Sequence, residues 1–164
     1  MTTEGTGRII TRDLIRQAIK LARPSAEAIL RYEGATWGPK LVMGFAQAPG
    51  VEAEQFSYDV IGSDEEWNSE WGDANEFTRI ALAKLAVVLR EKSPASVIVA
   101  TRPWCLEEGE FLYVGGTYCD GIAVVASGAK GWADEAISKI VTSNIVMLAQ
   151  LEVERRVQAG LKKI

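Results

Sequence analysis

The stretch from Asp120 to Val141, DGIAVVASGAKGWADEAISKIV, decides the fold of this chain. Asp120-Gly121 is a typical turn signal of a β-hairpin, and the apolar run that follows it, residues 122–126, predicts a strand. After a turn of small residues, apolar side chains recur at helical spacing from Trp132 to Ala159. A helix of that length spans ~42 Å. We therefore expect its end, residues 152–164, to project from the domain or to pack on another subunit as an oligomer contact.

The hairpin signal requires a strand before it, and other elements follow from the same kind of pattern. Thr11 is suited to cap a first helix, and Pro24 interrupts its apolar stripe, which predicts two short helices or one kinked helix. A later helix, with Phe77 and Leu85 in its buried stripe, ends at Ser93-Pro94. The remaining strands are expected at residues 40–48, 55–61, 97–100 and 111–118.

The order of these expected elements is α-α-β-β-α-β-β-β-α. It predicts an α+β fold in which a five-stranded antiparallel sheet is flanked by helices, an arrangement of the profilin-like kind. The chain of 164 residues has the length of one domain, and we interpret residues 1–164 as a single domain with a flexible lead-in over residues 1–10.

Composition restricts the possible chemistry. The chain has no histidine, which excludes histidine-assisted nucleophiles and histidine-ligated metals, and its two cysteines are too few for a thiolate metal site. A net charge of −4 argues against a non-specific nucleic-acid binder. The N-terminus lacks the pattern of a signal peptide, and the longest uncharged run near the C-terminus is short and partly polar. We therefore expect a cytoplasmic protein with reduced thiols and no membrane or nucleic-acid partner.

The segment from Arg102 to Glu108, RPWCLEE, is the candidate catalytic loop. It gathers a cation, an indole, a thiol and two carboxylates, and loops next to strand ends often carry active residues. Glu107, Glu108 and Cys105 are the candidate catalytic residues, since a carboxylate in an apolar pocket can act as an acid or base. Arg102 and Trp104 are candidate ligand contacts. The alternative is an ordinary exposed turn with a packed tryptophan.

Aromatic side chains supply two further candidate ligand contacts, Tyr118 and Trp71. Trp71 lies one helical turn from Trp67 if that segment is helical, and flat rings can stack on a flat ligand. The alternative is that the tryptophans close the core or a subunit interface. The acidic run Asp64 to Glu76 matches no cation-binding loop, so we interpret it as a solvated face and predict no metal site.

The stretch quoted first resembles the end of the GlcG/HbpS-like family, also described as the haem-degrading domain family. The resemblance rests on the Asp120-Gly121 turn, the strand that ends at Ser127-Gly128, and the helix that opens with Asp134-Glu135. It implies a compact profilin-like domain, a homo-oligomer and a pocket for a small molecule. Haem follows from the resemblance alone, and the lack of histidine weighs against its coordination here.

Three hypotheses result. The first is a small-molecule-binding protein of the GlcG/HbpS-like type without a cofactor. The second is a histidine-free enzyme that acts on a small organic acid or ring compound through carboxylates. The third is an interaction protein that uses its terminal helix as the contact.

Overall fold

A computed structural model describes residues 7–38, 40–60, 74–110 and 114–163. Its strands are β1 (Leu41–Gln47), β2 (Glu54–Asp59), β3 (Gly116–Cys119) and β4 (Ile122–Ser127), and all neighbouring pairs are antiparallel in the order β2-β1-β4-β3. Its helices are α1 (Arg12–Arg31), α2 (Ala74–Glu91), α3 (Ala95–Thr101) and α4 (Gly131–Gln158), with a short 3-10 turn at Pro103–Cys105. The fold class is therefore α+β, as predicted.

The prediction of five strands was wrong, because the described residues form four. Residues 97–100 belong to α3 and not to a strand. Ile98 is buried while Val97, next to it, is 43% exposed, so the run has the one-sided burial of a helix packed on α2. Four apolar residues in a row carry no period that separates this case from a buried strand.

Two other boundaries also differ from the prediction. The strand expected at residues 111–118 is formed only from Gly116 to Cys119, and residues 111–113 lie outside the described residues. Gly115 just before it has a φ of +140°, a conformation in which a side chain would be strained. Helix α1 runs as one element through Pro24, so of the two alternatives expected there, two short helices or one kinked helix, the first is wrong. The nine-element order is therefore corrected to α-β-β-α-α-β-β-α plus the 3-10 turn.

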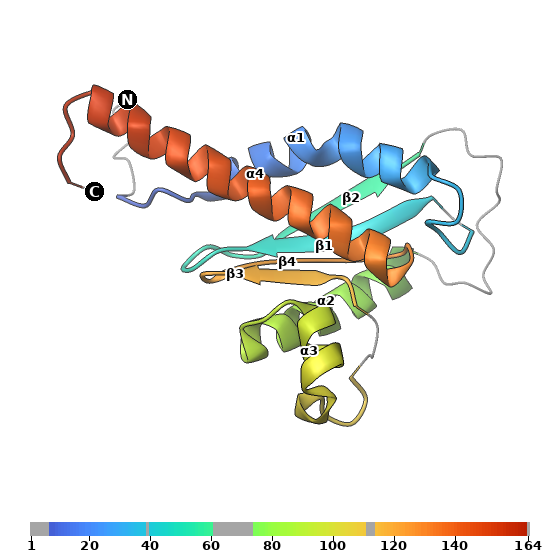
Figure 1. Ribbon diagram of the computed structural model, residues 1–164. Helices are drawn as coiled ribbons and strands as arrows, with labels where there is room; N and C mark the ends of the chain where they lie inside the picture. Colours follow the sequence, from blue (N-terminus) through green and yellow to red (C-terminus); the bar gives the residue numbers. More distant parts are fainter. Residues whose placement is uncertain (1–6, 39, 61–73, 111–113, 164) are drawn as a thin grey trace.

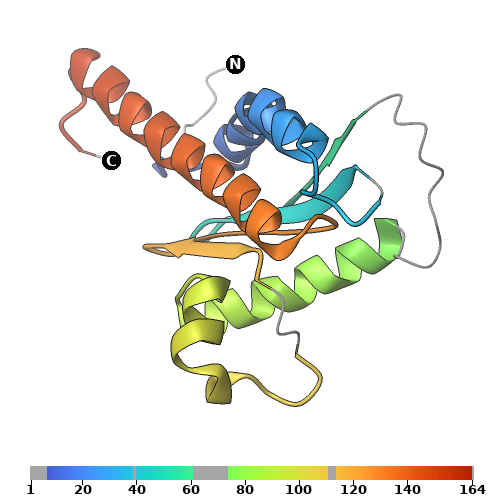
Figure 2. The same ribbon diagram turned by 45° about the vertical axis from the view of Figure 1, so that its right-hand side comes forward.

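The sheet lies between two layers of helices (Figures 1 and 2). Helices α1 and α4 cover one face, and α2 with α3 covers the other. The alternation of side chains along the strands builds both cores. On β4, Ile122 and Val124 join the core under α1 and α4, whereas Ala123 and Val125 join the core under α2. This explains why β4 is buried throughout and reads as a continuous apolar run.

The predicted β3–β4 hairpin is confirmed. Cys119 pairs with Ile122, and Asp120 and Gly121 between them have φ values of +46° and +92°. Two consecutive residues with positive φ give the tight turn that matches the twist of the strands. β4 also pairs with β1 on its other side, so it is an inner strand of the sheet, and the chain leaves it at Ser127 to enter the turn before α4.

Helix α4 is the longest element, at 28 residues. Its first half packs on β3, β4 and α1, and its second half extends past the end of the sheet (Figure 1). In the described part of the chain it is the one helix whose length and apolar composition would also allow it to cross a membrane. The fully buried residues of α4 end at Ile145, and beyond it Val146 and Leu148 are half-buried against the same core.

Candidate functional site

A hollow of about 380 Å³ opens between the first half of α2 and the turn that joins β4 to α4. We call it the Lys84 hollow. The described residues that line it are Trp37, Phe77, Ile80, Lys84, Ser127, Gly128, Ala129, Gly131 and Asp134. Its walls are apolar, and it contains one cation and one anion. This combination of apolar lining and few polar groups is typical of small-molecule sites.

Lys84 and Asp134 form a buried ion pair in this hollow. Their side chains are 4% and 3% exposed, and Nζ of Lys84 lies 3.3 Å from Oδ2 of Asp134. Nζ also donates a hydrogen bond to the carbonyl oxygen of Ala126, at 2.9 Å. The pair therefore links α2 to both β4 and α4. Two of the three N–H groups of the ammonium are used by acceptors in the described part of the chain.

The turn between β4 and α4 is shaped around the Asp134 carboxylate. Oδ1 of Asp134 accepts a hydrogen bond from the backbone N–H of Ala129 at 3.0 Å. Gly128 has a φ of +134°, and a Cβ there would overlap the carbonyl oxygen of Leu41. A small-residue turn is thus required by the close approach of this backbone to β1. The carboxylate holds the turn, and the turn brings Gly131 to the rim of the hollow.

Burial shifts the protonation of both partners. Burial raises the pKa of Asp134 to about 6, although the Lys84 ammonium and the N–H of Ala129 oppose the shift. Burial also lowers the pKa of Lys84, against the attraction of Asp134 and of Glu135. An acid with a raised pKa next to a lysine is one arrangement that can transfer protons without histidine.

An aromatic wall flanks the pair. Trp37 lies at the mouth of the hollow with 58% of its surface exposed, and Nζ of Lys130 lies 5.0 Å from the centre of its ring. Phe77, in the first turns of α2, is buried, and its ring lies next to Gly128. The hydrogen bond from the N–H of Lys130 to the carbonyl of Ala35 holds the Trp37 segment next to the β4–α4 turn. Trp37 and Phe77 therefore supply aromatic surface to the same hollow as the ion pair.

In the described part of the chain, no side-chain hydrogen bond or ion pair joins the residues of the predicted catalytic loop to one another. Glu107 and Glu108 are exposed, and Trp104 is 79% exposed. Arg102 donates from Nη2 to the carbonyl oxygen of Glu91, at 3.0 Å, and its Nε is buried without a partner in the described structure. Cys105 is half-buried, and its carbonyl accepts from Arg90.

The loop is organised by Arg90 instead. Its guanidinium contacts both carboxylate oxygens of Glu110, at 2.5 and 2.9 Å, and this pairing lowers the pKa of Glu110. Glu110 also accepts from the backbone N–H of Glu107 at 2.7 Å. These are contacts of an exposed turn that is tied to α2.

The two predicted aromatic contacts have different outcomes. Tyr118 is half-buried on β3 and packs against the core under α2, away from the residues that line the Lys84 hollow. Trp71, with Trp67 and most of the acidic run, lies outside the described residues. Both cysteines are free thiols, and Cys119 is exposed. Within residues 7–38, 40–60, 74–110 and 114–163 there is no group of three acidic, histidine or cysteine side chains placed to hold a metal ion.

Sequence reasoning overlooked Lys84, although the sequence contains a signal for it. Lys84 lies seven residues after Phe77 and four before Val88, on the stripe that buries α2. A lysine at a buried helical position needs a partner, because burying an unpaired ammonium is costly. The partner, Asp134, was noted only as a helix-opening acid, and nothing local to either residue indicates that the two meet.

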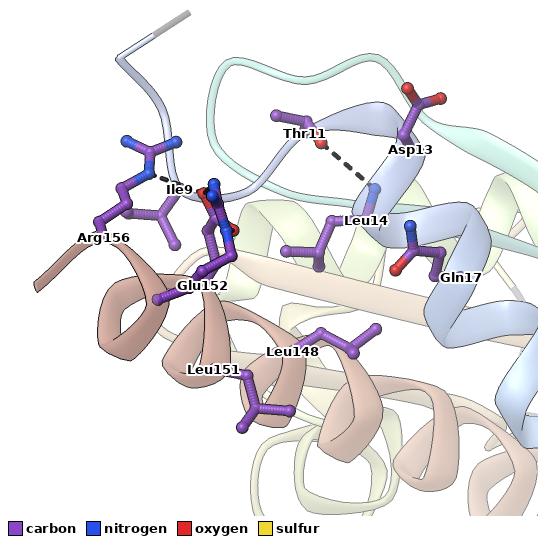
Figure 3. Close-up of a pocket in the computed structure, with 10 residues that line it drawn as sticks. Ile9, Thr11, Asp13, Leu14, Gln17, Leu148, Leu151, Glu152 and Arg156 are labelled. Atoms are coloured by element: carbon purple, nitrogen blue, oxygen red, sulfur yellow. Dashed lines mark hydrogen bonds and ion pairs between the residues drawn. The ribbon is translucent and has the colours of Figure 1, made fainter. Parts of the chain in front are cut away.

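A second hollow, of about 340 Å³, lies between the start of α1 and the second half of α4 (Figure 3). Ile9, Leu14 and Leu148 form its apolar side. Its charged groups already satisfy one another, since Glu152 accepts from Arg155 at 2.8 Å and from Arg156 at 2.7 Å. These hydrogen bonds lower the pKa of Glu152 to about 2. The carboxylate of Glu152 in this groove is therefore already paired with two guanidinium groups.

The fold and the hollow together define an α+β domain with a candidate small-molecule site at the junction of α2, β4 and α4. Comparisons with protein-family models, with curated proteins and with solved structures found no match.

Proposed function

We propose that this protein binds a small molecule in the Lys84 hollow. The observation that carries the proposal is the buried Lys84–Asp134 pair in an otherwise apolar hollow of about 380 Å³. That volume falls within the usual range for ligand sites, ~300–1,000 Å³. A buried ion pair contributes little to stability compared with apolar residues of the same size, so its presence calls for another role.

The chemistry of the lining suggests a flat, largely apolar ligand with one acidic group. Trp37, Phe77 and Ile80 offer apolar surface for the body of the ligand. The third N–H of Lys84 offers a donor to a carboxylate, and Lys130 adds a second positive charge at the mouth. The N-terminus of α4, at Gly131, adds its partial positive charge to the same side.

We also propose that this chain is a protein of the GlcG/HbpS-like type and that it has a profilin-like fold. In its support, the residues that carry the resemblance also build the hollow: Ser127-Gly128 forms the turn, and Asp134 holds the ion pair. Haem does not fit the residues present. Proteins hold haem iron with histidine, cysteine, methionine or tyrosine, and the described lining of the hollow contains none of these. We further propose that the protein is a homo-oligomer and that it is cytoplasmic. The two free thiols agree with the cytoplasmic location.

A fluorescence titration tests the binding proposal. We expect naphthoate to quench tryptophan emission saturably and naphthamide, its neutral analogue, to do so much more weakly. Replacing Trp37 by Phe should remove the signal, whereas the matched change Trp104→Phe, at an exposed indole outside the hollow, should keep it. Haemin serves as a comparison. The absence of saturable quenching by any aromatic acid, or an equal response in W37F, would refute the proposal.

A second candidate function is a histidine-free enzyme for a small organic acid or ring compound. It is favoured by the pKa of about 6 at Asp134, next to a lysine whose pKa burial lowers. In this version the ionised Asp134 accepts a proton from the carbon next to the ligand's carboxyl group, and the electron pair stays on the ligand as an enolate-type charge beside Lys84. The proton on Asp134 exchanges with solvent, and Asp134 then returns a solvent-derived proton, in D₂O a deuteron, to the carbon. The test is deuterium incorporation into naphthylacetate in D₂O, followed by NMR. We expect exchange that rises as Asp134 ionises and that is lost in Asp134→Asn. Exchange no faster than in buffer would exclude this function for that acid.

A further inference from the structure

The outer face of α4 carries two charged residues, one near each end, and it is not covered by the other described elements of the chain. Exposed residues recur along it at spacings of three and four, which places them on one side of the helix. They are Lys139, Ser143, Met147, Gln150, Leu151, Glu154 and Gln158. Val153 and Val157, both exposed, flank this stripe, and Ile140 and Val146 beside it are half-buried against the core under α1 and α4. We call this surface the outer face of α4.

The apolar exposure is large for a helix on the surface of a monomer. Met147, Leu151 and Val157 are 43%, 51% and 64% exposed. The inner side of α4 packs on α1, β3 and β4, and in the described part of the chain no other element covers the outer face. Exposed apolar surface rimmed by polar residues is typical of protein–protein contacts. The outer face is therefore a candidate docking surface.

The two charges on the outer face identify that partner as a second copy of this chain. Lys139 and Glu154 lie at equal distances from a point between Val146 and Met147. A symmetric dimer brings the same patch of two copies together, so such a patch must complement itself. If two α4 helices run antiparallel about that point, Lys139 of each copy lies level with Glu154 of the other.

Neither charge has a partner that would compete with this pairing. Among residues 7–38, 40–60, 74–110 and 114–163, Lys139 and Glu154 form no hydrogen bond or ion pair, whereas Glu152, Arg155 and Arg156 on the inner side are all paired. In a parallel arrangement Lys139 would meet Lys139 and Glu154 would meet Glu154, which like-charge repulsion disfavours. The two charges thus favour one orientation and one register.

The same register places apolar residues opposite apolar residues, and polar residues opposite polar residues. Val146 of one copy lies level with Met147 of the other, and Ser143 lies level with Gln150. The half of α4 that extends past the sheet then lies over the first half of the partner helix (Figure 1). A membrane would also cover an apolar helix, but a lysine and a glutamate on the covered face make lipid the poorer occupant.

We propose that two copies of this chain form a dimer through the outer faces of α4, antiparallel and centred between Val146 and Met147. This contact is independent of the Lys84 hollow and of any ligand. It also extends the interface beyond residues 152–164 to most of the length of α4.

The test measures the mass and self-association of the full chain by sedimentation equilibrium. We expect twice the chain mass of 17.9 kDa for the wild type. Met147→Glu should give a folded monomer, because it brings like charges together at the centre. The matched change Leu21→Glu, at an exposed apolar residue of α1, should leave the dimer intact. Circular dichroism establishes that each variant is folded.

Charge reversal tests the register. Lys139→Glu and Glu154→Lys should each raise the dissociation constant by ~tenfold or more, and the double variant should restore the affinity. Lys20→Glu, an exposed lysine on α1, is the control. A monomeric wild type, a dimer unaffected by Met147→Glu, or reversals that fail to compensate each other would overturn the proposal. So would a wild-type monomer that sediments with phosphatidylcholine vesicles, since lipid would then be the occupant.

Discussion

The ammonium group of Lys84 lies 3.3 Å from the carboxylate of Asp134, 50 residues further along the chain, and both side chains are almost completely buried. This ion pair joins the helix on one face of the sheet to the turn that begins the helix on the other face. Each partner depends on the other for its charge to be tolerated in the interior. The pair therefore couples the two layers of helices and defines the hollow at the same time.

Replacing one partner of the Lys84–Asp134 pair should lower the free energy of unfolding more than replacing both. We expect Lys84→Met to lower the free energy of unfolding by roughly 3–5 kcal/mol near neutral pH, because the Asp134 carboxylate is then buried without a counter-charge. The double variant Lys84→Met/Asp134→Asn should recover a large part of that loss. Urea unfolding followed by circular dichroism measures both, and Lys20→Met at an exposed lysine serves as control. Equal losses in the single and the double variant would contradict a coupled pair.

Asp134 should also impose a pH dependence on stability. Its pKa in the folded protein, about 6, is above the ordinary value of 3.8, so the folded state holds the proton more tightly than the unfolded state does. Its contribution to stability is complete below the unfolded pKa and is lost as the pH rises to about 6. We therefore expect the stability of the wild type relative to Asp134→Asn to fall over this interval.

The comparison with Asp134→Asn isolates that contribution. Glu110 and Glu152 have lowered pKa values, so they give the opposite slope in acid, but they do so equally in both proteins. Urea unfolding at a series of pH values provides the difference. A difference in stability between the two proteins that stays constant or grows with pH would show that folding does not raise the pKa of Asp134.

Local patterns predicted most of the fold, because most of its elements are defined by residues close in sequence. The Asp120-Gly121 turn and the period of α4 contain their own boundaries, and both are confirmed. The run at residues 97–100 carried no such period, and its helical state depends on packing against α2. Pro24 does not end α1 because the residues on both sides of it are buried in the same core.

The site could be predicted only in part, since it is made by contacts distant in sequence. The glycine at position 128 and the acid at position 134 were recognisable as a turn and a helix start. Their link to Lys84 depends on α2 crossing the sheet opposite β4, which no local pattern shows. The loop from Arg102 to Glu108 attracted attention because its residue types are reactive, yet Arg90 and Glu110 tie it down as an exposed turn.

Gly128 and Gly34 offer a matched test of how tightly the turn of the hollow is built. Both have positive φ values, +134° and +84°, so alanine is strained at either position. A Cβ at Gly34 meets open space, whereas a Cβ at Gly128 meets the backbone of β1. We expect Gly34→Ala to cost about 1 kcal/mol and Gly128→Ala to cost roughly 3 kcal/mol or more. Thermal and urea unfolding measure both losses, and similar values would argue against a tight turn.

Tyr58 tests the attachment of α1 to the sheet. Its hydroxyl donates a hydrogen bond to the carbonyl oxygen of Ile19 at 2.7 Å, and the side chain is fully buried. Tyr58→Phe should lower the free energy of unfolding by about 1–2 kcal/mol, because a buried carbonyl loses its donor. Tyr32→Phe is the matched control, since that ring is 72% exposed. Urea unfolding would show equal effects of the two changes if the Tyr58 hydrogen bond did not help to hold α1.

Arg90 should control the mobility of the Arg102 to Glu110 segment more than the stability of the fold. Its guanidinium fork contacts both oxygens of Glu110 and the carbonyl of Cys105, a geometry that an ammonium group does not reproduce. Because Arg90 is partly exposed, we expect Arg90→Lys to change the free energy of unfolding by less than about 1 kcal/mol. Hydrogen exchange and proteolysis within residues 103–110 should nevertheless become clearly faster. Arg79→Lys, where the partner Glu76 is on the same helix, is the control and should leave that segment protected. If Arg90→Lys left hydrogen exchange in residues 103–110 unchanged, other contacts would have to hold the segment, and its description as a turn tied to α2 by Arg90 would be wrong.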